Sequence, residues 1–254
     1  MAETIVRLKG VGKEFAEDGL VLDGIDLAVA AGEFVSLVGP SGCGKTSLLR
    51  LVAGLEAPTR GEIRRSGEVS AGSIGYVFQD PTLMPWADAF ANVHLPLKLK
   101  GVSRAEAEGR VMAALEMVGM ADAHHKLPRE LSGGMRMRVS IARAIVAAPR
   151  LLLMDEPFAA LDEITRFRLN DDLMALWERH GWTVIFVTHS VYEAVYLSSR
   201  VLVMQAGPGP IAEEFAVDVA HPRQPDFRLS ADFADRAAAI SLALRRAMGQ
   251  LAAR

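Results

Sequence analysis

The chain has 254 residues, half of them hydrophobic, and a formal net charge of -3 at neutral pH. This length and composition allow one large or two small globular domains with a sizeable core. The small negative charge argues against a broad nucleic-acid-binding surface. The single cysteine, Cys43, allows no internal disulfide and no cysteine-based zinc site, so we expect a reducing compartment such as the cytoplasm.

The first residues lack the basic and then apolar pattern of a signal peptide. No apolar run approaches the roughly 20 residues of a membrane helix. We therefore expect any association with a membrane to come through a partner.

Residues 4–37 predict short strands of an antiparallel arm, over 5–8 and over 21–29, the second broken at Asp23 and Gly24. Phe15 stands alone in a polar stretch of this arm. It could be a core anchor or an exposed ring on which adenine stacks, and its spacing alone favours the core.

The segment 34–49 has the order strand, loop, helix, and its loop reads Gly-Pro-Ser-Gly-Cys-Gly-Lys-Thr from residue 39 to residue 46. A triphosphate must lie close against main-chain N–H groups at the positive end of a helix, and the glycines leave that approach open. Lys45 would reach the outer phosphates, and the Thr46 hydroxyl would bind Mg²⁺. The segment therefore predicts a phosphate-binding loop.

The next apolar run, 74–78, predicts a strand with Gln79 at its end, which is where side chains contact ligands in α/β folds. Residues 87–146 then have helical character, including a capping box from Ser103 to Glu106. The adjacent His124 and His125 lack supporting ligands, so a solvated loop is the better interpretation than a metal site.

Ser132 is a plausible N-cap for a helix that begins with two glycines, Gly133 and Gly134. This helix start could be only a turn. It could equally be a second anion site, because its N–H groups would point outward at the positive end of the helix dipole. The residue pattern leaves both interpretations open.

The buried-strand pattern at 151–154 ends in Asp155 and Glu156. Packing explains consecutive carboxylates after a hydrophobic strand poorly, whereas a metal and phosphate site explains them well. Asp155 would bind Mg²⁺, and Glu156 would orient and polarise an attacking water.

Asp162 predicts the cap of a helix that ends at Gly181. Its apolar side would include Ile164, Phe167, Leu173, Leu176 and Trp177. The following strand, 183–187, ends at His189, and a third polar side chain at a strand end favours contact with phosphate.

Further strands are expected over 200–204 and 211–219, and an amphipathic helix from about Ala231. Its apolar positions include Phe233, Ala237, Ile240, Leu244, Met248 and Leu251. We favour docking of this helix on the chain's own surface over a contact with a partner or a membrane.

Six segments together, in this order, resemble the ATP-binding cassette (ABC) family of ATPases over residues 4–220: residues 39–46 (Walker A), Gln79 (Q-loop), 131–134 (signature), 151–156 (Walker B), 160–162 (D-loop) and His189 (H-loop). The resemblance implies an α/β fold, in which a P-loop NTPase core carries an antiparallel β arm and an inserted α-helical subdomain. It divides the chain into the arm with the first part of the core (1–88), the helical signature subdomain (89–149), the second part of the core (150–220) and a C-terminal tail (221–254).

The resemblance also implies the cofactors, ATP and Mg²⁺, and a role for each site residue. The catalytic residues would be Glu156, His189, Lys45 and Gln79, and the Mg²⁺ ligands Thr46, Gln79 and Asp155. The same chain's ATP contacts would be Phe15 under adenine, Gly39, Ser41, Gly42, Cys43, Gly44, Lys45, Thr46, Ser47 and Asp155. ATP held by a second cassette would meet Ser132, Gly133, Gly134 and Asp162.

Four longer motifs resemble those of the nitrate, sulfonate and taurine importer subgroup. They are Phe-Gln-Asp at 78–80, Met-Pro-Trp at 84–86, Leu-Ser-Gly-Gly-Met at 131–135 and Asp-Glu-Pro-Phe at 155–158. The resemblance implies an ATPase subunit on the cytoplasmic face of the cell membrane. Its partners would be a second ATPase subunit, transmembrane permease subunits and, indirectly, a periplasmic or extracellular solute-binding protein. The chain departs from the family pattern at Met135, Met137, Ser190 and Pro210.

Two other functions compete with transport. A soluble ABC-type ATPase acting on nucleic acid or ribosomes often has tandem cassettes, coiled coils or zinc modules, and this chain has one cassette, no sustained heptads and one cysteine. A non-hydrolysing interaction subunit is opposed by the intact Lys45, Asp155, Glu156 and His189. The transported solute cannot be read from a subunit that meets only nucleotide and permease.

Overall fold

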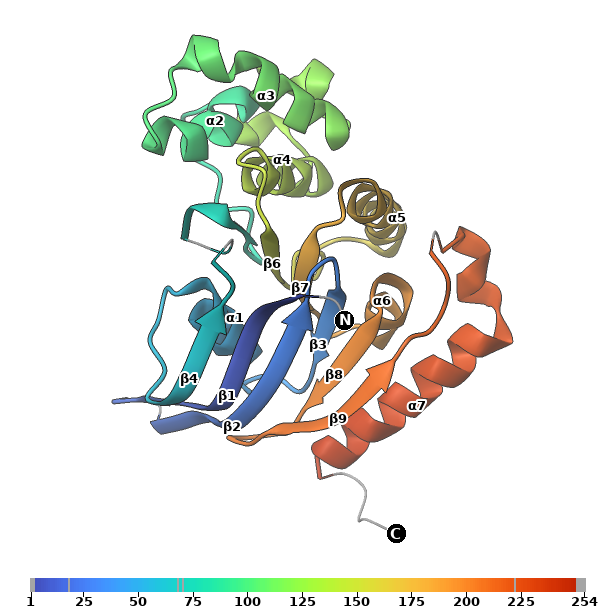
Figure 1. Ribbon diagram of the computed structural model, residues 1–254. Helices are drawn as coiled ribbons and strands as arrows, with labels where there is room; N and C mark the ends of the chain where they lie inside the picture. The colour runs from blue at the N-terminus through green and yellow to red at the C-terminus, as the bar shows by residue number, and fades with distance from the viewer. Residues whose placement is uncertain (1–2, 18, 68, 70, 222, 250–254) are drawn as a thin grey trace.

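The strands of the computed structural model, which describes residues 3–17, 19–67, 69, 71–221 and 223–249, form two sheets (Figure 1). The smaller sheet is antiparallel with the order β2-β1-β4. It consists of β1 (Thr4–Phe15), β2 (Gly19–Ala30) and β4 (Arg60–Arg65). This sheet is the predicted antiparallel arm.

The larger sheet has the order β5-β6-β7-β3-β8-β9, and every neighbouring pair is parallel except β8 with β9. Its strands are β3 (Phe34–Val38), β5 (Ile74–Val77), β6 (Leu151–Asp155), β7 (Thr183–Val187), β8 (Arg200–Met204) and β9 (Ile211–Ala216). The central strands β3, β6 and β7 are buried throughout, as expected of parallel strands covered on both faces.

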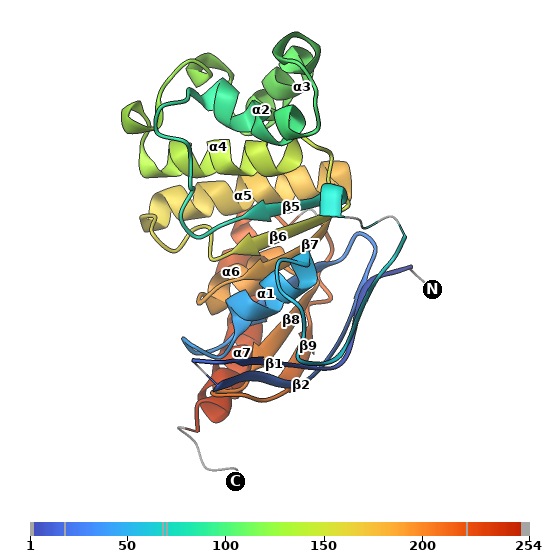
Figure 2. The ribbon, with the colours of Figure 1, turned by 90° about the vertical axis from the view of Figure 1, so that its left-hand side faces the viewer.

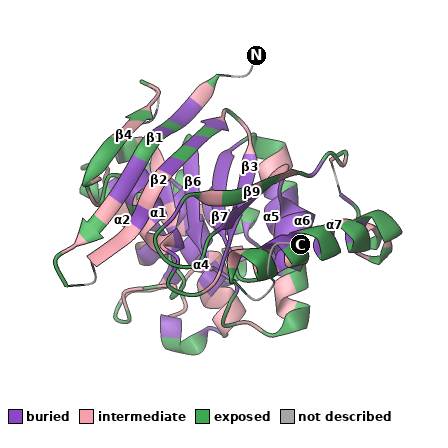
Figure 3. Ribbon diagram, turned by 90° about the horizontal axis from the view of Figure 1, so that it is seen from below, coloured by how far each residue is buried: buried purple, intermediate pink, exposed green. Residues whose placement is uncertain are grey.

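Two hydrophobic clusters cover the two faces of the larger sheet, and alternate residues of each strand belong to opposite clusters. In β3, Phe34 and Val38 face one cluster while Val35 and Leu37 face the other. The helix α1 (Lys45–Ala53) lies between the two sheets and contacts β2, β6 and β7 (Figure 2). Figure 3 shows β3, β6 and β7 of the larger sheet buried at the centre of the molecule.

Helices α5 (Glu163–His180), α6 (Val191–Leu197) and α7 (Ala231–Ala247) cover the other face. A separate group, α2 (Ala89–Leu99), α3 (Arg104–Met117) and α4 (Gly133–Ile145), is inserted between β5 and β6 (Figure 1). These features confirm the predicted α/β fold with an arm and inserted helices. The segment limits stay a proposal, and α2 to α4 all lie inside the proposed 89–149.

Four short 3₁₀ turns complete the description: η1 (Ala71–Ser73), η2 (Ala121–Ala123), η3 (Pro128–Glu130) and η4 (Pro225–Leu229). The helix starts lie where the sequence places them, because Ser103, Ser132 and Asp162 each accept a hydrogen bond from the main chain three residues later. Across these described ranges, we find no helix with the length and apolar character needed to span a bilayer.

The tail helix α7 docks on the chain itself, as predicted, against α6, β8 and β9. Its buried residues are Phe233, Ala237, Ile240 and Ala243. Met248 is 39% exposed and does not continue this face, and the predicted position Leu251 lies outside the described residues.

Three sequence expectations are wrong in detail. The arm strands are continuous twelve-residue strands, because Gly10 and Gly24 adopt positive φ angles and β1 passes Gly10 with a register shift against β2 instead of ending. Strand β9 ends at Ala216, before the predicted residue 219. In α5, Ile164 and Phe167 face outward, because the buried side of the helix is carried by Leu169, Leu173 and Leu176.

Candidate functional site

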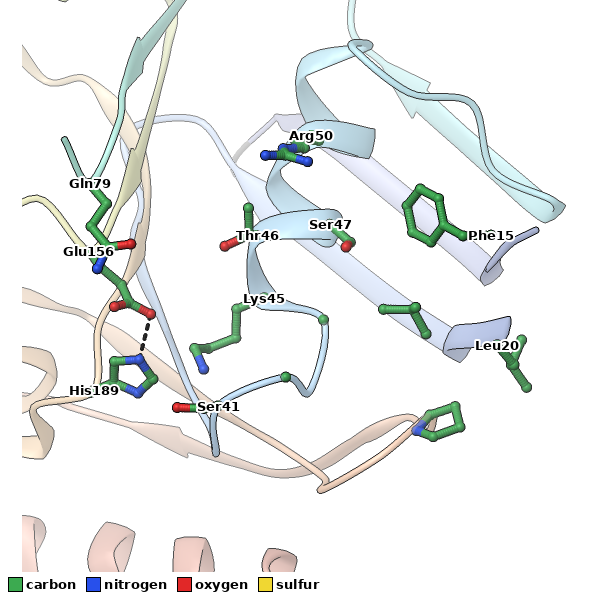
Figure 4. A pocket seen from close by; sticks show the side chains of 14 residues that line it. Phe15, Leu20, Ser41, Lys45, Thr46, Ser47, Arg50, Gln79, Glu156 and His189 are labelled. Atoms are coloured by element: carbon green, nitrogen blue, oxygen red, sulfur yellow. Dashed lines mark ion pairs between the residues drawn. The ribbon is translucent and has the colours of Figure 1, made fainter. Parts of the chain in front are cut away.

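A cavity of about 690 Å³ opens where the phosphate-binding loop meets the carboxyl ends of the strands. It lies at the edge where α/β sheets bind their ligands. Figure 4 shows Gln79, Glu156 and His189 on one side of the loop and Phe15 on the other. The lining comprises Phe15, Leu20, Val21, Ser41, Gly42, Gly44, Lys45, Thr46, Ser47, Arg50, Gln79, Glu156, His189 and Pro208.

The glycines of the loop are needed where other atoms approach closely. A Cβ atom on Gly39 would lie 2.7 Å from the Cys43 Sγ, and one on Gly44 would lie 2.5 Å from a methyl group of Leu22. Gly42 and Gly44 also have φ angles of 78° and 94°, which side-chain-bearing residues rarely adopt. Gly39 and Cys43 are buried behind the loop and form its base, while Ser41 and Gly42 are exposed at its tip.

The ammonium group of Lys45 lies over this loop. The residue is only 5% exposed, and its Nζ donates hydrogen bonds to the carbonyl oxygens of Gly39 and Pro40 at 2.8 and 2.9 Å. Burial raises the pKa of the Cys43 thiol, and the charge of the Lys45 ammonium only partly offsets this rise. Lys45 is therefore a buried cation held at the mouth of a glycine loop.

Thr46, which lines the cavity, forms an oxygen-rich pair with the buried Asp155 behind it. The Thr46 hydroxyl donates to Oδ1 of Asp155 at 3.0 Å, and the Tyr76 hydroxyl lies 3.5 Å from Oδ2. Burial raises the pKa of Asp155, whereas the Thr46 hydrogen bond and the positive charges of Arg50 and Lys45 act in the opposite direction.

Glu156 and His189 lie side by side on one wall of the cavity, with 2.6 Å between Oε1 and Nε2 (Figure 4). The Glu156 side chain is 12% exposed and that of His189 44%. Glu156 has a φ angle of 47°, one of three positive values at non-glycine positions among the residues described. The turn after β6 thus holds the carboxylate in an uncommon backbone conformation, which is characteristic of functional sites.

The main chain that carries His189 is fixed from beneath by buried polar groups. The Thr188 hydroxyl donates to the Glu193 carboxylate and accepts from the main-chain N–H of Ser190 at 2.9 Å. Glu193 is 6% exposed, and burial raises its pKa. These contacts give His189 a rigid support while leaving its ring accessible.

Phe15 does not join the core, although its spacing favoured that position. The ring lies at the end of β1, is partly exposed, and lines the cavity with Leu20 and Val21 of β2. The Lys13 ammonium lies 4.6 Å from its centroid. The structure therefore presents an aromatic face at the rim of the cavity.

The structure brings most of the predicted site residues together but leaves four apart. Ser132, Gly133 and Gly134 start α4, and Asp162 caps α5; none of them lines the cavity that holds Lys45. They lie beside one another instead, since a Cβ on Gly134 would be 2.8 Å from Thr165 in the first turn of α5.

Sequence reasoning missed several lining residues: Leu20, Val21, Arg50 and Pro208, together with Tyr76 beside Asp155. Leu20 lies at the start of β2 and Pro208 in the connection between β8 and β9, and only tertiary structure brings them to the loop. Arg50 carried a signal, because it lies one helical turn after Thr46 on the same side of α1.

Comparison with known proteins gives one family and close relatives. The family model described as ABC transporter matches residues 22–159. The aliphatic sulfonates import ATP-binding protein of Rhodopseudomonas palustris is 46% identical over 217 residues, covering 85% of this chain and 76% of that protein. The taurine import ATP-binding protein of Sinorhizobium fredii is 44% identical over 207 residues, covering 79% of this chain and 78% of that protein.

Solved structures agree with these relatives. A dimeric ABC transporter cassette, described as bacterial, superimposes with a TM-score of 0.74 at 32% identity, covering 85% of this chain and all of that one. The same cassette in a post-hydrolysis state bound to ADP and phosphate gives the same values.

Proposed function

Since the chain belongs to the ABC transporter family, we propose that this ATP-hydrolysing subunit powers an importer of nitrate, a sulfonate, taurine or a related small solute. One observation carries the assignment of roles: the 2.6 Å pair of Glu156 and His189 faces the loop that holds Lys45 and Thr46. This arrangement supports a role for Glu156 as the carboxylate that activates water opposite a triphosphate cradle.

The cradle fits the triphosphate of ATP. Gly42 and Gly44 leave main-chain N–H groups open at the start of α1, and Lys45 supplies a cation for the outer phosphates. Ser41 and Ser47 line the same cavity. Phe15 offers its ring to adenine, at the rim away from Glu156 (Figure 4).

The pair of Thr46 and Asp155 fits Mg²⁺. Hydroxyl and carboxylate oxygens are the ligands this ion prefers, and they lie 3.0 Å apart beside the loop. Gln79 lines the cavity close to them and would be a third ligand. When bound, the ion would neutralise charge on the phosphate oxygens.

Hydrolysis transfers the γ-phosphoryl group of ATP to water and releases ADP and phosphate. Glu156 orients the water and accepts its proton as the oxygen attacks the γ-phosphorus. His189 holds the Glu156 carboxylate in place through Nε2 and contacts the γ-phosphate. Lys45 stabilises the charge that develops on the phosphate oxygens, so the protein contributes mainly position and electrostatics.

A second copy of the chain completes the site. Ser132 and the main-chain N–H groups of Gly133 and Gly134 lie at the positive end of the α4 dipole, and they reach the γ-phosphate of the facing copy. Asp162 lies beside them. Two copies thus enclose two ATP molecules, and closure drives the permease while hydrolysis reopens the pair.

The permease would contact the junction of the larger sheet and the inserted helices. A hollow of about 480 Å³ there is lined by Phe78, Leu99 and Arg143 among other residues. Leu99 and the nearby Trp86 are each 79% exposed. We place the chain at the cytoplasmic face of the cell membrane, held there by this permease, with a solute-binding protein outside.

Phosphate release by the purified chain with ATP and Mg²⁺ tests the proposal. We expect Glu156→Gln to reduce turnover at least a hundredfold and to leave nucleotide affinity unchanged, because the cradle keeps its shape without the carboxylate. The variant should also accumulate as an ATP-bound dimer in gel filtration. Glu116→Gln, an exposed glutamate on α3, is the matched control. Normal turnover by Glu156→Gln would contradict the assigned role.

Co-purification from the native membrane tests the importer assignment. We expect a permease and a solute-binding protein to accompany the chain, and their identity to give the solute. Recovery of ATPase activity without any membrane protein would instead favour a soluble ABC-type ATPase.

A further inference from the structure

Four large apolar side chains gather on one side of the molecule, where α5, α6 and η4 meet. Ile164 and Phe167 of α5, Tyr192 of α6 and Leu229 of η4 are 68%, 39%, 63% and 86% exposed. We call these four residues the α5–α6 patch. Single exposed apolar residues are ordinary on protein surfaces, but a gathered set indicates a contact with another molecule.

The patch is one surface. Phe167, Tyr192 and Leu229 line a common hollow of about 620 Å³. Ile164 lies three residues before Phe167 and so shares its side of the helix. In Figure 1, α5, α6 and the start of α7 lie together beside the larger sheet.

Packed side chains beneath the patch hold its residues in place. The guanidinium of Arg228 lies 3.4 Å from the Tyr196 ring centroid and 5.0 Å from that of Phe167, and it pairs with Asp171 at 2.8 Å. The Tyr192 and Phe233 rings are 5.8 Å apart. Such packing pre-forms a surface for a partner, so association needs little reorganisation.

The patch continues the face that the proposed function directs toward a second copy. A hollow of about 310 Å³ shares Arg166, Ser190 and Glu193 with the patch hollow and shares Glu156 and His189 with the nucleotide cavity. Three adjoining hollows therefore run from the nucleotide site to Leu229.

The start of α5 makes the same connection by another route. Ile164 follows the cap residue Asp162 by two positions. The neighbouring Thr165 and Leu161 approach the signature turn: a Cβ built on Gly134 would lie 2.8 Å from the Thr165 side chain, and one on Gly133 would lie 3.5 Å from that of Leu161. A partner that reaches this turn and Asp162 thus comes directly to Ile164.

We propose that the α5–α6 patch is part of the interface between two copies of this chain and strengthens their ATP-bound dimer. The inference rests on the proposed function, which sets the two nucleotide sites face to face. In a two-fold dimer the same surface serves on both copies, so the apolar side chains of one patch can contact those of its counterpart. Tyrosine and phenylalanine are also enriched at the centres of such interfaces.

The test measures dimer dissociation by sedimentation in the Glu156→Gln background, with ATP and Mg²⁺. We expect Ile164→Glu and Leu229→Glu each to weaken the dimer at least tenfold, because a carboxylate would be buried without a partner. Both side chains are largely exposed, so the fold and monomer nucleotide binding should be unchanged, which thermal unfolding and nucleotide titration check. Leu55→Glu, just after α1 and outside the patch, is the matched control, because Leu55 is likewise largely exposed, at 63%.

The outcomes separate the two proposals. If Glu156→Gln alone forms no dimer with ATP, the proposed function fails. If that dimer forms and both patch variants dissociate like the parent, the function stands and the patch proposal is overturned. Equal weakening by Leu55→Glu would overturn it as well, because the effect would then be a general consequence of added charge.

Discussion

At the scale of single residues, the two adjacent carboxylates of the site, Asp155 and Glu156, have different surroundings. Asp155 ends β6 and is buried beside the Thr46 hydroxyl, and burial raises its pKa. Glu156 follows in a left-handed conformation that turns it away to the His189 imidazole. These surroundings suit the roles proposed above, with Asp155 as the metal ligand and Glu156 as the residue that activates the water.

Phe15 gives a test at this scale. We expect Phe15→Ala to raise the KM for ATP about tenfold, since aromatic stacking on a base contributes roughly 1–3 kcal/mol and this ring is partly exposed. The kcat should change little, because the ring lies away from Glu156. Phe15→Tyr, which keeps the ring, should behave like the parent in steady-state ATPase assays. An unchanged KM in Phe15→Ala would assign adenine to another surface.

The chemistry of the cradle could be predicted from local pattern, whereas its rim could not. Lys45 and Thr46 follow from the glycine spacing, and Asp155 and Glu156 from carboxylates after an apolar run. Phe15 was ambiguous, because a lone aromatic residue in a polar stretch shows no periodicity. Only the hairpin of β1 and β2 decides that it faces the loop.

At the scale of elements, buried parallel strands and capped helices were the most predictable. The strand β7 is a continuous apolar run with both faces covered, and α1 ends at Gly54, whose positive φ angle suits glycine. The arm was harder, because glycine inside an antiparallel pair resembles a break. Gly10 and Gly24 have positive φ angles within strands that continue past them.

The segment between β9 and α7 carries a pH-dependent contribution to stability. His221 packs on Trp177 of α5 with ring centroids 4.6 Å apart, and neither ring nitrogen has a hydrogen-bond partner among the residues that the structure describes. Burial, and then the charge of Arg223, lower the pKa of His221 to about 4. The Glu178 carboxylate, 3.7 Å away, would act in the opposite direction, and burial of the ring prevails.

A depressed histidine pKa means that the unfolded chain binds the extra proton between its ordinary value and about pH 4. Stability is therefore lost as the pH falls through this window. We expect the free energy of unfolding, from urea titrations at about pH 7 and about pH 5, to fall less in His221→Gln than in the parent, by up to about 2 kcal/mol. The exposed His125→Gln is the control. Equal losses in His221→Gln and the parent would mean that His221 protonates normally in the folded state.

At the scale of the whole molecule, the proposed function gives one chain two half-sites that face different nucleotides. The cradle of Lys45 and the turn at Ser132 belong to different parts of the fold, and the cavity around Lys45 is not lined by the turn. The sequence left the role of that turn open, because a serine cap before two glycines also fits a simple helix start. In the proposed function, two copies of the chain must therefore assemble before either hydrolyses ATP.

Gly133→Asp tests this composite site most directly. A Cβ on Gly133 would make an ordinary 3.5 Å contact with Leu161, and an acidic residue suits the first turn of a helix, so the fold should be kept. The new carboxylate would repel the γ-phosphate of the facing copy. We predict unchanged ATP affinity with phosphate release reduced at least a hundredfold, and near-parental release by Gly133→Ala. Parental turnover by Gly133→Asp would show that each chain hydrolyses ATP in a self-sufficient site.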